Sequence, residues 1–202
     1  DKEKSFYIPN PSDKSFEILN NFNKSCNVDV FFALSHGVHR GVLKIGKTDD
    51  RVIFIKKLKD ITPNVKFDLY GLDKVQPIWA DHYFKTISNA KMGLNLSRGQ
   101  AIKYYSSDRI TQITGNGLVT LIDEKTGYQN FFNNNEMVFY KNLSDLSEKI
   151  LKISKDDKLR KKIGRNGKHK YLKHFNSNLV AQFIIDKTFN NVNKKKYLWH
   201  EK

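Results

Sequence analysis

Short apolar runs alternate with longer amphipathic segments along most of this chain. The apolar runs cover residues 28–35, 66–71, 91–97, 118–123 and 137–141. Each run has the length and the bulky side chains typical of a buried strand. Three of the segments between them carry apolar residues at helical spacing. Parallel neighbours need such long crossover connections, whereas antiparallel strands need only tight turns. The alternation therefore predicts a mostly parallel sheet of about five to six strands, with helices on both faces.

After residue 141 the pattern contains helical segments only. Apolar residues recur at helical spacing through residues 143–154, 156–175 and 178–189, and no further strand-like run follows. A chain that alternates strands with helices and then ends in helices is typical of the α/β class. We therefore expect a Rossmann-like, three-layer α/β/α fold with a helical C-terminal segment.

The charge of the chain is strongly positive. It has 36 Lys and Arg residues against 21 Asp and Glu residues, which gives a formal net charge of +15. This excess favours an anionic partner, and nucleotides, nucleic acids and lipid head groups all meet that description. Charge alone does not choose among the three.

The single cysteine, Cys26, excludes an internal disulfide framework and a Cys-rich zinc site. It also favours a reducing compartment. No apolar run approaches the roughly 20 residues that a membrane-spanning helix needs. We expect a cytoplasmic protein, with peripheral association at the inner membrane surface as a further expectation.

Glycine, serine and arginine gather in the loops that follow the predicted strands. Residues 35–41 follow the first strand, Gly71 and Leu72 the second, and Ser97 and Arg98 the third. In an open parallel sheet, ligands bind beyond the carboxyl ends of the strands. Glycine lets backbone N–H groups approach a phosphate, and arginine adds bidentate hydrogen bonds. Any one such loop is as often plain connecting chain, but the three together predict an anion site at this edge.

The first of these loops, SHGVHRGVLKIGK, has neither the GxGxxG spacing of dinucleotide-binding folds nor a Walker P-loop. Arg40 and Lys44 lie four residues apart and reach one diphosphate if both face the cleft; otherwise Lys44 is a solvated charge. His36 and His39 have no carboxylate or cysteine at metal-ligand spacing, so we expect them to donate hydrogen bonds to substrate. No metal site and no cofactor are expected.

The segment SSDRITQITGNG predicts a short helix that begins at the same edge of the sheet. Ser107 lies at its start, and Arg109 and Gln112 are three residues apart and therefore share one face. This face is expected to lie above the third and fourth strands. The alternative for Arg109 is a salt bridge within the fold, to Asp108 or Asp123.

The order of these segments along the chain resembles that of a known protein family. The run SSDRITQITGNGLVTLID, the segment Glu136–Tyr140, the run LSDLSEKI and the basic run RNGKHKYLKHF together resemble the C-terminal domain of GT-B glycosyltransferases, of the group-1 or spore-protein type. The likeness covers roughly residues 28–180. The family motif begins Arg-x-x-Glu-x-x-x-x-Gly, so Arg109 matches its arginine, whereas Gln112 stands where the family usually has glutamate.

The resemblance implies the donor half of an enzyme that moves a sugar from a nucleoside diphosphate to a glycan or lipid-linked acceptor. Arg40 and Lys44 resemble the basic pair that faces the diphosphate, and the 71–72 loop resembles the one beside the nucleobase. Gln112 takes the place of the group that holds the ribose hydroxyls. The acceptor-binding domain of such an enzyme would precede these residues, so we expect the chain alone to bind nucleotide weakly and to transfer no sugar.

The resemblance also suggests a division of the chain. Residues 1–26 are expected to form a linker and a first helix, residues 27–191 a Rossmann-like domain that binds the nucleotide sugar, and residues 192–202 a solvated basic tail.

Two other classes of function stay open. The first is a non-catalytic module that binds nucleotide or nucleic acid. Nucleic acid ranks lower as a partner, because the basic residues are spread along helices without a stripe of interleaved aromatic residues. The second is a scaffold that keeps the fold and has lost the chemistry, which the glutamine at position 112 allows.

Overall fold

The computed structural model describes residues 6–34, 49–72, 75–105, 107–193 and 196–200. Five parallel strands form one sheet in the order β2-β1-β3-β4-β5. The strands are β1 (Val28–Ala33), β2 (Phe67–Tyr70), β3 (Ala90–Asn95), β4 (Val119–Asp123) and β5 (Val138–Tyr140). The predicted α/β class, the parallel sheet and the position of every strand are confirmed.

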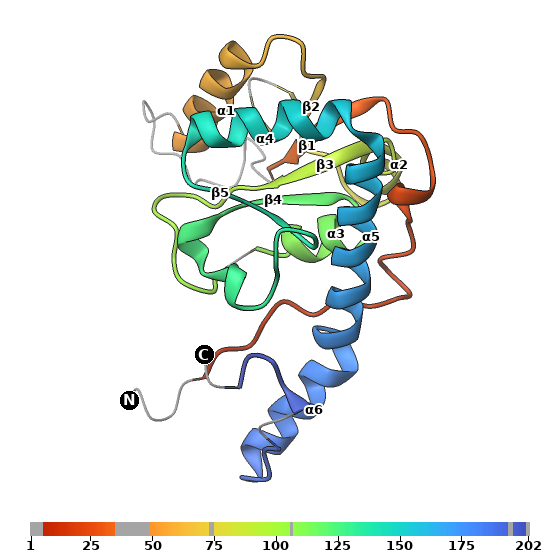
Figure 1. Ribbon diagram of the computed structural model, residues 1–202. Helices are drawn as coiled ribbons and strands as arrows, with labels where there is room; N and C mark the ends of the chain where they lie inside the picture. Colours follow the sequence, from red (N-terminus) through yellow and green to blue (C-terminus); the bar gives the residue numbers. More distant parts are fainter. Residues whose placement is uncertain (1–5, 35–48, 73–74, 106, 194–195, 201–202) are drawn as a thin grey trace.

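Helices cover both faces of this sheet (Figure 1). Their bounds are α1 (Asp50–Ile61), α2 (Ala80–Ile87), α3 (Arg109–Gly115), α4 (Leu143–Lys155), α5 (Asp157–His174) and α6 (Ser177–Thr188). Alternate residues of β1 point to opposite faces. Val30 and Phe32 join a core cluster with apolar side chains of α1 and α4, whereas Phe31 joins one with side chains of α2 and α3.

Helix α5 packs across the ends of the sheet where β4 and β5 begin. A Cβ atom at Gly164 would lie 2.4 Å from the carbonyl oxygen of Gly117, and one at Gly167 would lie 2.4 Å from that of Glu136. Because only glycine has no Cβ, these two positions let the helix approach the backbone closely. Glu136 itself pairs with Lys170 of α5, at 2.8 Å from carboxylate to amine.

The N-terminal segment differs from the expectation of a linker with a first helix. Within residues 6–26 of the described chain there is no α-helix; the segment contains a turn at residues 14–16 and the short 3-10 helix Asn21–Asn23. Side chains of α5 hold this irregular segment in place by donating to its carbonyls. Arg160 donates to Asn21 and Lys24, and Lys168 donates to Glu17 and Leu19. These tertiary contacts satisfy backbone groups that a helix would otherwise pair internally.

The expectation of a solvated C-terminal tail is wrong for its aromatic residues. Tyr197 and Trp199 are buried in a cluster with Phe175 of α5 and Phe183 of α6. The Tyr197 hydroxyl donates a hydrogen bond to Asp186. Burial of two large aromatic rings is strongly favourable, so this part of the tail packs on the fold although the neighbouring Lys196 is exposed. The domain boundaries at residues 26 and 191 stay a prediction.

Candidate functional site

The strand order marks one position in the sheet as a natural binding crevice. From β1 the chain crosses to β2 on one side, and from β3 it crosses to β4 on the other. The loops at the carboxyl ends of β1 and β3 therefore diverge, which opens a crevice between them. Open α/β sheets bind their ligands at such switch points.

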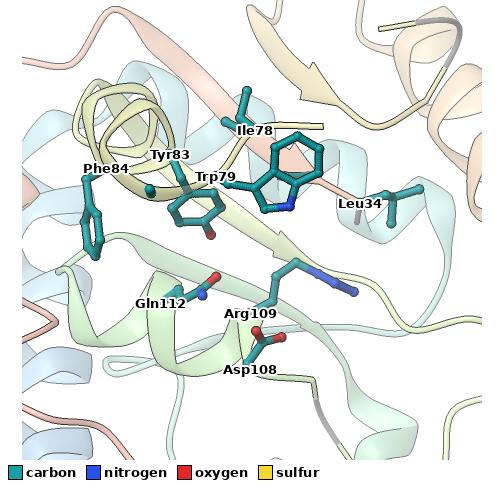
Figure 2. Close-up of a pocket in the computed structure, with 10 residues that line it drawn as sticks. Leu34, Ile78, Trp79, Tyr83, Phe84, Asp108, Arg109 and Gln112 are labelled. Atoms are coloured by element: carbon teal, nitrogen blue, oxygen red, sulfur yellow. The ribbon is translucent and has the colours of Figure 1, made fainter. Parts of the chain in front are cut away.

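A pocket of about 250 Å³ lies at this point (Figure 2). Leu34 lines it at the end of β1, Ile78 and Trp79 line it just before α2, and Tyr83 lies on α2. Figure 2 shows the Trp79 and Tyr83 side chains projecting toward α3, which contributes the remaining polar residues. Those residues are Arg109 and Gln112, and Asp108 lines the pocket from the position just before α3.

The Arg109 side chain makes one hydrogen bond and one contact with an aromatic ring in the described part of the chain. Its Nη2 donates to the carbonyl oxygen of Leu96 at 3.1 Å, and its guanidinium lies 5.4 Å from the centre of the Phe32 ring. Its Nε is buried and has no hydrogen-bond partner in the described part of the chain. Burial, and then the nearby positive charge of Arg51, lower the pKa of Arg109. An anion in the pocket would relieve both effects.

The predicted alternative for Arg109, an internal salt bridge, is not found. Neither Asp108 nor Asp123 forms an ion pair with Arg109 in the described ranges. Asp108 lies close enough to oppose the lowering of the arginine pKa, but it is exposed to solvent. The guanidinium therefore keeps donor capacity for a ligand.

Two further polar groups face the same pocket. The Tyr83 hydroxyl is buried and makes no hydrogen bond with the described residues. Its burial raises the pKa of Tyr83, and the positive charge of Arg109 opposes that rise. The Gln112 side chain is half-buried and its amide forms no hydrogen bond with any described residue. Buried polar groups normally have a hydrogen-bond partner. The Tyr83 hydroxyl and the Arg109 Nε both lack one among the described residues, which indicates that the pocket can accept a polar ligand.

The loop after β3 is fastened to the start of α1. The Gly99 amide donates to Asp50 at 2.8 Å, so this amide is not open to a phosphate. Next to it, Arg51 forms a bidentate pair with Asp49, at 2.7 and 3.0 Å. Charge-assisted pairs of this kind are geometrically specific. The Gly99–Asp50 hydrogen bond therefore joins the 97–99 turn to α1, and the Asp49–Arg51 pair fixes the start of that helix.

The predicted site residues fall into four groups, one of which is the Gly71 and Leu72 pair. Arg109 and Gln112 line the pocket, with half-buried Ser107 immediately before their helix. Ser97 is half-buried and Arg98 exposed in the loop after β3, outside the pocket lining. The candidates His36, Arg40 and Lys44 lie outside the described residues.

The Gly71 and Leu72 pair has a clear structural role. Gly71 has a φ of +74°, and a Cβ there would lie 2.0 Å from the carbonyl oxygen of Leu34. Leu72 is buried in the main core cluster. The pair therefore turns the chain at the end of β2, and its place beside a nucleobase stays a prediction.

Sequence reasoning missed the aromatic wall of the pocket. Trp79, which immediately precedes α2, is 61% exposed. Tyr83 follows it by four residues, on the first turn of that helix, and both side chains line the pocket. The run PIWADHYF carried this signal as an aromatic pair at helical spacing. What it could not show is that α3 would face the pair.

A comparison with protein-family models identifies the family of this chain. Residues 51–186 match the family model described as glycosyl transferase-like, and this span includes every described residue of the pocket except those at the end of β1. The chain belongs to the glycosyl transferase-like family. Among curated proteins, none matches it.

Solved structures agree on the fold. TarM is similar over 94% of this chain and 38% of its own, with a TM-score of 0.57 at 15% identity. An S. aureus TarM variant solved with fondaparinux, α-GlcNAc-glycerol and UDP gives 0.58 at 13% identity, over the same shares. The sucrose-phosphate synthase of Thermosynechococcus elongatus gives 0.55 at 12% identity, over 92% and 49% of the two chains.

These comparisons confirm the predicted GT-B C-terminal domain and its Rossmann-like fold. This glycosyl transferase-like chain spans between 38% and 49% of the length of the structures it matches. No helix in the described ranges is long and apolar enough to cross a membrane. The described residues also contain no cluster of three or more His, Cys, Asp or Glu side chains suited to a metal ion.

Proposed function

We propose that this chain is the donor-binding part of a glycosyltransferase that moves a sugar from a nucleoside diphosphate to a glycan or lipid-linked acceptor. The main support for the proposal is the Arg109 guanidinium at the switch point of a glycosyl transferase-like fold. Its Nη2 donates to Leu96, whereas its buried Nε has no hydrogen-bond partner among the described residues. Its free donor capacity faces a pocket of about 250 Å³, which has room for part of a nucleotide sugar.

The role of Arg109 in this proposal is to offset negative charge. When the sugar leaves, charge develops on the diphosphate, and fixed donors in a water-poor site stabilise such charge far better than water does. Arg40 and Lys44 are proposed to act on the same diphosphate, with His36 and Ser107 as hydrogen-bond donors. Gln112 is proposed to hold the ribose hydroxyls, since an amide both donates and accepts.

Trp79 is proposed as the surface on which the nucleobase stacks. The indole is largely exposed at the pocket rim, and Tyr83 lies one helical turn further on. Stacking of a base on an aromatic side chain stabilises binding by roughly 1–3 kcal/mol. The TarM variant was solved with UDP, so uridine nucleotides are the first ligands to test.

Arg109→Ala is expected to remove most of the thermal stabilisation that UDP or a UDP-sugar gives to the wild-type chain. A hydrogen bond to a charged group contributes about 1.5–3 kcal/mol, which corresponds to a roughly 10- to 100-fold weaker Kd. A panel of uridine and guanosine diphosphates and their sugars, measured by thermal shift, tests this. Lys85→Ala, an exposed change on α2, is the matched control. An undiminished shift in Arg109→Ala would remove that residue from the site.

Nucleotide binding is expected to quench the fluorescence of Trp79. The chain has two tryptophans, and Trp199 is only 1% exposed within another cluster. Stacking requires contact with the ring, so UDP should quench whereas inorganic pyrophosphate, which has no base, should not. Trp79→Phe should abolish the quenching and leave the Trp199 emission unchanged. Equal quenching in the wild type and in Trp79→Phe would contradict a role for this indole.

A further inference from the structure

Helix α5 carries a continuous stripe of basic side chains on its solvent face. The stripe consists of exposed residues separated by three or four positions, which places them on one side of the helix. They are Lys158, Lys162, Arg165, His169 and Lys173. In the part of the chain that the structure describes, none of the five forms an ion pair. The positive charges of the three lysines and of Arg165 are therefore available to a partner.

The N-terminal segment runs along this helix in the opposite direction; we call residues 12–24 the strap. Ser12 exchanges backbone hydrogen bonds of 2.8 Å with Phe175 and Ser177 at the C-terminal end of α5. Near the other end, Arg160 donates to the carbonyls of Asn21 and Lys24, both at 2.8 Å. The strap therefore lies beside the helix along most of its length.

The strap also touches the stripe directly. The Arg165 guanidinium lies 5.4 Å from the centre of the Phe22 ring, and the His169 ring lies 6.3 Å from it. Lys168 of α5 donates to the Glu17 carbonyl at 2.9 Å. The strap and the stripe thus form one continuous surface.

Two large apolar side chains project from the strap into solvent. Phe16 is 67% exposed and Ile18 is 62% exposed. They flank Glu17, whose side chain is buried against Gly115 and whose carbonyl is held by Lys168. The chain turns here, because the amides of Phe16 and Glu17 both donate to the Asp13 carbonyl and the Ile18 amide donates to the Phe16 carbonyl. This local turn buries Glu17 and leaves Phe16 and Ile18 on its solvent side. An exposed aromatic and an exposed aliphatic side chain therefore lie on the same segment as Phe22, which contacts two residues of the stripe.

Helix α5 runs past one end of the sheet (Figure 1), and its surface lies at the opposite end from the pocket. Helix α5 packs against Gly117 and Glu136, which precede β4 and β5, whereas the pocket lies beyond the carboxyl end of β1. A partner on the stripe would leave the pocket open.

We propose that the α5 stripe and the strap form a docking surface for an anionic lipid bilayer. Each basic residue near a negatively charged membrane contributes attraction that falls off within a Debye length. Phe16 and Ile18 would enter the boundary between the head groups and the acyl chains, where apolar side chains gain from burial. Nucleic acid fits less well, because the aliphatic Ile18 has no base or phosphate partner to gain from. The surface goes beyond donor binding and does not depend on it.

Co-sedimentation of the chain with lipid vesicles tests the proposal. We expect binding to vesicles of phosphatidylcholine with about 30% phosphatidylglycerol, release by salt, and no binding to phosphatidylcholine alone. Changing Lys158, Lys162 and Lys173 to Gln should weaken binding about one hundred-fold, at roughly 1 kcal/mol for each charge. The matched control changes Lys57, Lys59 and Lys85 to Gln. These three lysines are also exposed, and they lie on α1 and α2. Phe16→Ser with Ile18→Ser should also weaken binding.

Three other outcomes would overturn the proposal. Equal loss in the two lysine triples would show attraction by net charge rather than by the stripe. An unaffected Phe16 and Ile18 double variant would show that no apolar insertion occurs. Stripe-dependent binding to RNA without vesicle binding would assign the surface to nucleic acid. Because the lysine triple leaves the pocket intact, its thermal shift with UDP separates failure here from failure of the donor site.

Discussion

Replacing Trp199 by alanine is expected to lower the free energy of unfolding by about 3 kcal/mol. Loss of a large buried aromatic side chain costs roughly 3–5 kcal/mol, because both the transfer energy and the packing around the cavity are lost. The Trp199 ring is 1% exposed and stacks on Phe175 at 5.5 Å between ring centres. Its indole Nε1 is buried without a hydrogen-bond partner in the described residues, which offsets part of the gain and places the effect at the lower end of the range.

Urea unfolding of the wild type and of Trp199→Ala measures this difference. The matched control is Leu198→Ala, since Leu198 is the neighbouring residue and is 43% exposed. The control should change stability by less than about 1 kcal/mol, because most of its side chain never leaves water. If the two substitutions had similar effects, burial of the Trp199 ring would not be what holds the C-terminal tail on the fold.

The tail shows what a local pattern cannot reveal. Its composition, NKKKYLWHEK, is that of a solvated charge run with a short apolar break. The two buried rings find their partners on α5 and α6, where Phe175 and Phe183 lie. Long-range packing of this kind overrides local composition, and no spacing within the tail encodes it.

The strands were predictable because their signal is local. In β1, β3 and β4 the side chains on both faces are largely buried. Such strands read as continuous apolar runs bounded by polar residues. The strap was not predictable for the opposite reason. Its course is fixed by donors on α5, more than one hundred residues away in sequence, and an irregular segment held by distant side chains has no periodic signature.

The candidate site was predictable in part. The rule that ligands bind beyond the carboxyl ends of parallel strands led to Arg109 and Gln112, and both line the pocket. The same rule does not say which helix faces them, so Trp79 and Tyr83 were missed. It also predicts polar loops without predicting their internal bonds, such as the one between Gly99 and Asp50.

Arg160→Met is expected to lower the free energy of unfolding by about 3–5 kcal/mol, as when one partner of a buried charged network is removed. The Arg160 side chain is 1% exposed. Its guanidinium donates to the carbonyls of Asn21 and Lys24 and pairs with Asp157, at 2.6 Å from nitrogen to oxygen. Methionine fills a similar volume but donates nothing, so both carbonyls lose their partner.

Lys161→Met provides the control, because Lys161 pairs with the same Asp157 from a partly exposed position. An exposed pair of this kind contributes only about 0–1 kcal/mol. Hydrogen exchange adds a second measurement. In Arg160→Met the amides of Asn21, Asn23 and Lys24 should exchange faster than in Lys161→Met, since their carbonyl neighbours are released from α5. Equal stability and equal exchange in the two variants would mean that Arg160 does not fasten the strap, and that the strap holds its place beside the basic stripe through Lys168 and Ser12 instead.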